Sequence, residues 1–250
     1  DQDIILLGFI APLVSLLFLG ATMALLVFDL KKPGRFLFLL TKPNVNSWLT
    51  LGGYILMFFG VLLGIWLAQI YRDGMVSPWV MWPAALFAIA SAGYSAFLFA
   101  QARGRDFWQS PLLFWHLVVK AISAGAAVLI LIGTFELITP YQFMSPRMFF
   151  YLIHILVISL LAGLAMVCGD LFMKHGSEEA TRASALLLSG PLSKSFWIFV
   201  VGLGVVIPAG LILWQANALI TGMAASLLSL FGLWMHEHLW IKAGQAVPLS

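Results

Sequence analysis

Charged residues are scarce in this sequence. Asp, Glu, Lys and Arg make up 9% of its 250 residues, whereas a soluble domain carries about 25%. The protein therefore has too few charges to cover a surface that faces water, and a soluble globular protein is excluded. Hydrophobic residues make up 62%, and the mean hydropathy is +1.02. We expect an all-α membrane protein, a polytopic bundle of transmembrane helices that forms a single integral membrane domain over residues 1–250.

Cysteine is almost absent, since Cys168 is the only one in the sequence. One thiol excludes an intrachain disulfide, cysteine-bound zinc and an iron–sulfur cluster held by this protein alone, and we expect no metal in it. The sequence also lacks a cleavable signal pattern. It lacks a basic soluble face as well, because nearly all of its Lys and Arg lie in loops between apolar segments. We therefore expect no nucleic-acid partner.

Long apolar runs are what the sequence has in abundance. A helix needs about 20 apolar residues to cross a bilayer, and seven segments qualify. These segments are residues 4–28, 48–70, 79–100, 112–133, 148–169, 196–214 and 218–241. Residue 1 is Asp rather than Met, so we expect one further helix before it and eight spans in the full protein. The longest loop, residues 170–194, is predicted to contain a short helix near residues 178–188.

Tryptophan recurs near the ends of the predicted spans. The tryptophans near span ends are Trp48, Trp79, Trp82, Trp108, Trp197, Trp214 and Trp240. Trp is enriched where a membrane protein meets the two water interfaces, so this pattern predicts an aromatic belt.

The loops alternate between two faces, and basic residues favour one of them. Ten lie on the first face: Lys31, Lys32, Arg35, Lys42, Arg103, Arg105, Lys174, Arg182, Lys194 and Lys242. The other face carries only Arg72 and Arg147. Because cytoplasmic loops collect Lys and Arg, we expect the first face to be cytoplasmic.

The loop at residues 29–48 joins the first two spans and is rich in turn-forming residues. Pro33 and Gly34 favour a tight turn between its basic residues. We expect Lys31, Lys32 and Lys42, with Arg103 and Arg105 of the next loop on that face, to form a docking surface for a soluble partner. Attraction to anionic membrane lipids, worth about 1 kcal/mol per residue, explains the same charges. Both interpretations remain open.

Polar residues inside the predicted spans are candidates for chemistry, because a charge inside a bilayer costs several kcal/mol. Lys120 lies nine residues after Pro111, about 13 Å along a helix, and His116 lies one turn earlier on the same face. Tyr94 lies nine residues before Arg103 in the neighbouring span. Together the three side chains would form a polar pocket for a quinone, which needs apolar walls and proton donors for its carbonyls. The alternative is that Lys120 reaches to the membrane surface and Tyr94 bonds a neighbouring helix.

Two histidines in the same region suggest a haem site as the alternative to a quinone pocket. His116 and His236 both lie near the predicted cytoplasmic end and would be able to ligate one haem iron from two helices. The run His236, Glu237 and His238 is more simply a polar helix end. Glu136 and Asp170 lie at span ends, where we expect solvated side chains or points at which protons enter and leave.

Three stretches carry a resemblance to a known family. They are Asp29-Leu-Lys-Lys-Pro-Gly-Arg-Phe with Ser47-Trp48 after it, Ser91-Ala-Gly-Tyr94 with Gln109-Ser-Pro-Leu112 beyond it, and the final Lys242-Ala-Gly-Gln-Ala-Val-Pro-Leu-Ser250. Together they resemble the polysulfide reductase membrane subunits, which are NrfD-like quinone-reactive anchors. The resemblance spans nearly the whole sequence.

The resemblance implies a haem-free anchor of eight helices, in which a first helical unit (here about residues 1–133) holds the quinone and a second unit (about 147–250) follows. Tyr94 matches the family's quinone-contacting tyrosine, and Asp29 and Arg35 match its polar loop motif. The implied cofactor is menaquinone or ubiquinone. The implied partners are a ferredoxin-like iron–sulfur subunit and a molybdopterin catalytic subunit. The family's first helix supplies further quinone ligands, and we expect this sequence to begin after that helix.

The expected function follows from these observations. We expect a quinone-reactive subunit of a respiratory oxidoreductase, surrounded by membrane lipids in the inner (cytoplasmic) membrane of a bacterium or archaeon. It would exchange electrons between an iron–sulfur partner and the quinone pool. A haem b anchor is the alternative, followed by a transporter, although we find no internal repeat and no paired broken helices of the kind that transporters use.

Overall fold

The computed structural model describes residues 3–28, 34, 47–102, 104–137, 142–172, 177–215 and 218–247. Every regular element in these ranges is a helix, and seven helices are long and apolar enough to span a membrane. They cover Ile4–Phe28, Trp48–Asp73, Pro78–Ala100, Leu113–Gly133, Pro146–Phe172, Ser193–Trp214 and Leu219–Ala246. The predicted fold class and the seven spans are confirmed. Most of the helices extend a few residues beyond the predicted apolar runs.

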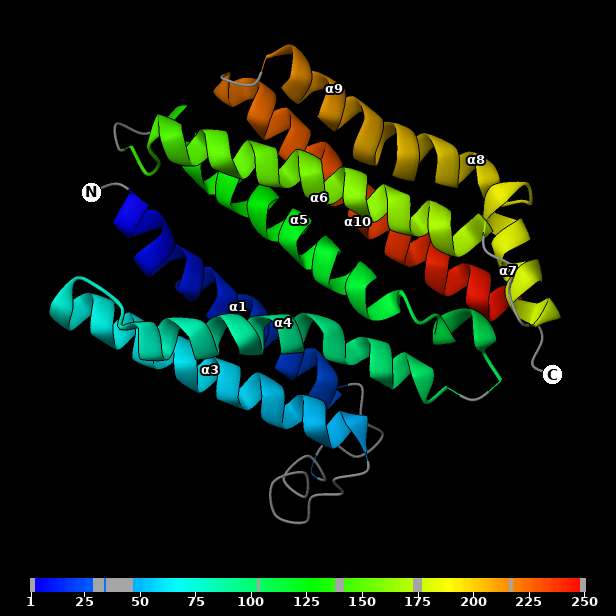
Figure 1. The fold of residues 1–250 in the computed structure, drawn as a ribbon, viewed down its shortest axis with the longest axis horizontal. Helices are drawn as coiled ribbons and strands as arrows, with labels where there is room; N and C mark the ends of the chain where they lie inside the picture. Colours follow the sequence, from blue (N-terminus) through cyan, green and yellow to red (C-terminus); the bar gives the residue numbers. More distant parts are fainter. Residues whose placement is uncertain are drawn as a thin grey trace. The chain divides into compact units, whose positions relative to one another are not determined.

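The protein forms two compact units, Asp1–Leu98 and Phe99–Ser250, which are described separately below. The functional division predicted near residues 133–147 stays a prediction. Unit 1 holds the π-helical segment η1 (Ile4–Ile10), α1 (Ala11–Phe28), α3 (Trp48–Asp73) and most of α4 (Pro78–Ala100). Unit 2 holds η3 (Asp106–Gln109), α5 (Leu113–Gly133), η4 (Thr134–Leu137), α6 (Pro146–Phe172), α7 (Glu178–Leu188), α8 (Ser193–Ser195), η5 (Phe196–Val206), α9 (Ile207–Trp214) and α10 (Leu219–Ala246) (Figure 1).

Unit 1 packs around a small core on its three long helices. Leu19 of α1, Leu56 and Leu63 of α3 and Tyr94 of α4 are buried together. A polar contact also ties the start of unit 1 to α3, because the Trp66 indole N–H donates to the carbonyl oxygen of Gly8 at 3.0 Å. This bond satisfies an indole donor in an otherwise apolar setting.

Unit 2 is built on α5, α6 and α10, and α5 packs against both of the others (Figure 1). The Ser123 hydroxyl on α5 donates to the Ser159 hydroxyl on α6 at 2.8 Å. On the other side of α10, Gly204 of η5 and Gly232 approach so closely that a Cβ on Gly232 would lie 2.2 Å from the Gly204 Cα. Small residues permit this close packing, which is typical of helices in membranes.

The sixth span changes its hydrogen-bonding pattern along its length. After the short helix α8, η5 is π-helical, and the α-helical pattern of α9 begins at Ile207 with Pro208 directly after it. Proline has no N–H to donate, so the backbone pattern is free to change where it occurs. The predicted short helix between the fifth and sixth spans is confirmed as α7, and the Ser177 hydroxyl accepts the Ala180 N–H at its start.

Two of the predicted belt tryptophans are buried instead. Trp108 and Trp240 are 9% and 5% exposed, and they pack with Phe99 and Phe107 in one aromatic cluster. By contrast, Trp79 is 89% exposed. The belt prediction was therefore wrong for Trp108 and Trp240, because the loop between α4 and α5 folds back against the end of α10.

Candidate functional site

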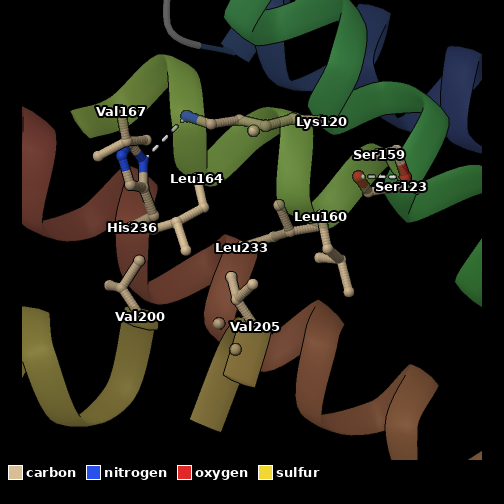
Figure 2. A pocket seen from close by; sticks show the side chains of 13 residues that line it. Lys120, Ser123, Ser159, Leu160, Leu164, Val167, Val200, Val205, Leu233 and His236 are labelled. Atoms are coloured by element: carbon tan, nitrogen blue, oxygen red, sulfur yellow. Dashed lines mark hydrogen bonds between the residues drawn. The ribbon is translucent and has the colours of Figure 1, made fainter. Parts of the chain in front are cut away.

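Lys120 is the centre of a polar cluster inside unit 2. Its ammonium nitrogen lies 2.7 Å from Glu237 Oε1 and 2.9 Å from His236 Nδ1, so it joins α5 to α10 (Figure 2 shows the contact with His236). The Lys120 side chain is 13% exposed and that of Glu237 is 40% exposed. A buried cation is tolerated when an anion and a hydrogen-bond acceptor replace the water that it loses.

Lys120 has two partners, His236 and Glu237, and the sequence analysis did not predict that they contact it. His236 is 6% exposed and Glu237 forms an ion pair, so the interpretation of residues 236–238 as a simple polar helix end was wrong. A signal for the pair was present in the sequence. Lys120 is the only Lys or Arg within the predicted spans, and Glu237 is the only Asp or Glu.

His116 lies one helical turn before Lys120 and is 3% exposed. Its Nε2 atom has no hydrogen-bond partner among the described residues. Its ring centroid lies 6.3 Å from that of His236, with an angle of 84° between the rings. The two histidines therefore lie close together on α5 and α10, and the haem alternative stays a prediction.

Asp170 is buried near the same end of unit 2. It is 9% exposed, and its Oδ1 atom accepts the Ser110 hydroxyl at 2.6 Å. The expectation of a solvated Asp170 was wrong, because Ser110 folds over the end of α6. Glu136 lies in η4, at the opposite end of α5, and its side chain is outside the described residues.

A cavity of about 40 Å³ lies directly beside the Lys120 cluster. Figure 2 shows Lys120 with His236 on one side and Ser123 with Ser159 on the other, with apolar side chains between them. The apolar lining includes Leu160, Leu164 and Leu233, together with residues of η5. The cavity therefore connects two polar pairs through an apolar interior.

Tyr94 is the buried aromatic donor of unit 1. It is 6% exposed, and its ring packs on α3 at the place where Gly52 leaves space. A Cβ on Gly52 would lie 2.3 Å from the Tyr94 Cε2 atom. Tyr94 belongs to unit 1, whereas His116 and Lys120 belong to unit 2. Their predicted convergence on one pocket therefore stays a prediction.

Most of the predicted loop residues lie outside the described part of the protein. These are Asp29, Lys31, Lys32, Arg35, Lys42 and Arg103. Arg105 is described, and its guanidinium donates to the carbonyl oxygen of Gly244 and lies 5.2 Å from the centre of the Trp108 ring. Arg105 therefore holds the loop before α5 against the end of α10.

Metal coordination finds no support in the described residues, where no three His, Cys, Asp or Glu side chains come together as ligands. The polar groups of unit 2 are arranged instead as donors and acceptors of hydrogen bonds and protons.

Comparison with known proteins gives consistent similarities. A family model described as polysulphide reductase, NrfD matches residues 3–248. The sequence is 24% identical to the protein NrfD of Escherichia coli strain K12, over 88% of this protein and 77% of that one. It is 28% identical to a polysulfide reductase subunit of Wolinella succinogenes, over 78% of this protein and 67% of that one.

Proposed function

The protein belongs to the polysulphide reductase NrfD family, and from this premise we propose that it is the quinone-reactive membrane subunit of an oxidoreductase complex. In this role it exchanges electrons between an iron–sulfur partner and menaquinone or ubiquinone in the bilayer. Family membership and the seven apolar spans support a multi-pass membrane subunit. The quinone chemistry and the partners are the parts of the proposal that need an experiment.

The burial of Tyr94 against Gly52 carries the quinone assignment. Reduction of a quinone to a quinol takes up two electrons and two protons, so the site must offer apolar walls and a hydrogen-bond donor to a carbonyl. Tyr94 supplies a phenol within the apolar core of unit 1. Gly52 fixes where that ring lies, since any side chain there would displace it. We propose that Asp29 and Arg35, and His116 and Lys120 of unit 2, contribute further polar groups.

Electrons must reach this subunit from a partner, because a single cysteine cannot hold an iron–sulfur cluster. One relative is by name one component of a polysulfide reductase, which implies companion subunits. We propose a ferredoxin-like iron–sulfur subunit next to this protein and a molybdopterin catalytic subunit beyond it.

The partner would dock on the basic loops, with Lys31, Lys32, Lys42, Arg103 and Arg105 as the contact residues. We propose that these loops face the cytoplasm of a bacterium or archaeon and that the subunit lies in the inner membrane. Asp170 and Glu136, at opposite ends of unit 2, are proposed points at which protons enter or leave.

The test of the quinone assignment is Tyr94→Phe in the intact complex. Loss of one hydrogen bond to a carbonyl costs about 1–3 kcal/mol, so kcat/KM for a soluble quinone or quinol analogue should fall about 5- to 150-fold. Assembly should be normal, because the ring that packs on Gly52 is retained.

The matched control is Tyr71→Phe, which removes a hydroxyl from the same unit at a position that is 90% exposed. It should leave the kinetics unchanged. Wild-type kcat/KM in a fully assembled Tyr94→Phe complex would show that Tyr94 does not contact the quinone.

A further inference from the structure

One side of α10 carries a continuous stripe of exposed side chains. Its members, in order along the helix, are Ile220, Leu227, Phe231, Trp234, His238 and Lys242. They lie three, four or seven residues apart, so they share one side of the helix. The stripe is aliphatic where it begins, aromatic in its middle and basic where it ends. Its chemistry therefore changes in one direction along the span.

The aromatic rings of the stripe contact one another and η5. The Phe231 ring centroid lies 6.0 Å from that of Phe199 on η5 and 5.9 Å from that of Trp234. Trp234 in turn stacks on His238, with 6.0 Å between the ring centroids and 22° between the ring planes. The three rings on α10 are nevertheless exposed, and Trp234 is 60% exposed. They form a wall on which a flexible apolar chain can pack.

Two lysines lie at the basic end of this wall. Gly204 and Gly232 mark the place where the sixth span crosses α10, and a short connection joins these two helices in antiparallel order. Lys194 lies ten residues before Gly204, and Lys242 lies ten residues after Gly232. The two lysines are therefore at the same end of unit 2, where the start of the sixth span meets the end of α10 (Figure 1).

The charges of Lys194 and Lys242 are not neutralised within the described part of the protein. Both side chains are exposed, and neither forms an ion pair with a described acidic residue. Lys120 and Arg182, by contrast, are paired with carboxylates. The two lysines are therefore available to an anion outside the protein.

The length of the stripe matches one leaflet of a bilayer. Lys242 follows Phe231 by 11 residues, which is about 16 Å along a helix. Half of a hydrocarbon core of about 30 Å is about 15 Å. A lipid with its phosphate beside Lys242 would place its ester groups near His238 and Trp234, which have the polar tips typical of the membrane interface. Its acyl chains would lie along Phe231 and Leu227.

We propose that this stripe, together with Lys194, is a binding site for one anionic phospholipid. The two ammonium groups attract the lipid phosphate as point charges, and the aromatic wall holds one acyl chain. A zwitterionic lipid carries a cation next to its phosphate, and the lysines repel that cation. The site therefore selects a head group with a net negative charge.

The side chains of the stripe favour a lipid over a helix of another protein. Helices that pack together in a membrane use small residues, which let their backbones approach closely. The stripe has no Gly, Ala or Ser, and its Phe, Trp and Lys side chains would hold a second helix away. A flexible acyl chain, in contrast, follows such an uneven surface.

The lipid site goes beyond the proposed quinone chemistry and does not rest on it. All of its residues belong to unit 2, and lipid binding is measured without a quinone. Failure of one proposal therefore leaves the other standing.

Lipid binding is tested by native mass spectrometry of the purified full-length protein, titrated in detergent with phosphatidylglycerol or with phosphatidylcholine of the same acyl chains. The first phosphatidylglycerol should bind more tightly than any later one and more tightly than phosphatidylcholine. A lysine beside a lipid phosphate is worth about fivefold in affinity. Lys194→Gln and Lys242→Gln should therefore each raise the Kd about fivefold, and the double variant about 25-fold.

Two matched variants separate the stripe from general charge and from exposed tryptophan. Arg182→Gln removes an exposed cation from α7, which also packs on α10, and should leave the Kd within about twofold. Trp234→Ala should weaken the binding of both lipids, whereas Trp214→Ala, at the other end of the sixth span and 79% exposed, should not. Equal Kd values for the two lipids, or the same loss in Arg182→Gln as in Lys242→Gln, would overturn the site.

The occupant of the stripe is tested in the intact complex in nanodiscs. A photoreactive phosphatidylglycerol should label the peptide of residues 231–242, and the double lysine variant should lose most of this label. A photoreactive amino acid at position 238 should likewise cross-link to lipid. Cross-links from this position to another protein subunit would show that the stripe is a protein interface, and the lipid site would be refuted.

Discussion

At the scale of single residues, Lys120 shows how a charge inside a membrane protein dictates its surroundings. An unpaired ammonium would cost several kcal/mol there. The protein offsets this cost with Glu237 and His236, both on the facing side of α10. This arrangement explains why three ionisable residues occur together in a sequence that is only 9% charged.

Gly52 gives a sharp test at this scale, because it determines the position of Tyr94. A methyl group on Gly52 would lie 2.3 Å from the ring, so in Gly52→Ala the ring must move. If the phenol donates to a quinone carbonyl, its displacement should lower kcat/KM about 5- to 150-fold, as for a lost hydrogen bond. Steady-state kinetics of the complex with a quinone analogue measure this change.

The neighbouring glycine is the control for that substitution. A Cβ on Gly53 would meet no atom within 4 Å, so Gly53→Ala makes the same chemical change on the same helix without moving Tyr94. Gly52→Ala should therefore lower kcat/KM, whereas Gly53→Ala should leave it unchanged. Equal kinetics in both would mean that the position of the Tyr94 ring does not matter for turnover.

Sequence analysis identified an interior polar residue correctly when the apolar run around that residue was enough to show that it lies inside the membrane. Lys120 and His116 lie inside one long apolar run, nine and five residues after Pro111, and their depth follows from helical rise. The burial of His236, Asp170 and Trp108 was missed. Each lies near a span end, where burial depends on how another element packs over it, and spacing along the sequence holds no such information.

At the scale of helices, the crossing of α10 and η5 is a tightly packed contact in unit 2. The Gly204 and Gly232 backbones touch, so Gly232→Ala would place a methyl group 2.2 Å from a backbone carbon. A backbone atom cannot rotate away, and the two helices must separate. We expect a destabilisation of about 1–3 kcal/mol, seen as a lower midpoint of thermal unfolding in detergent.

Gly210 is the comparison position for this crossing. It lies in the same span as Gly204, and a Cβ there would meet no atom within 4 Å. Gly210→Ala should unfold at the wild-type temperature or slightly above it, since Ala favours the helix. A Gly232→Ala protein as stable as Gly210→Ala would show that the crossing is looser than described.

The seven spans were predictable because hydrophobic length alone decides whether a helix can cross a bilayer. The short helix α7 was predictable as well, because Ser177 precedes two acidic residues in its first turn. The π-helical pattern of η5 was not predictable. Hydrophobic length does not distinguish a π-helical stretch from an α-helical one.

At the scale of the whole molecule, the two units offer different chemistry. Unit 1 holds a buried phenol in an apolar core, whereas unit 2 holds the Lys120–Glu237 ion pair, two buried histidines and several buried serines. The quinone assignment proposed above rests on the phenol of unit 1. The basic loops would then give the soluble partner its place of contact.

Photoaffinity labelling of the intact complex tests the central claim, that this protein binds quinone, most directly. A quinone with a photoreactive group should label peptides of α3 and α4 around Gly52 and Tyr94, and excess unlabelled quinone should remove the label. The Tyr94→Phe complex should require more quinone for the same labelling. Labelling that appears only on partner subunits, or that excess quinone does not displace, would contradict the assignment of this protein as the quinone-reactive subunit.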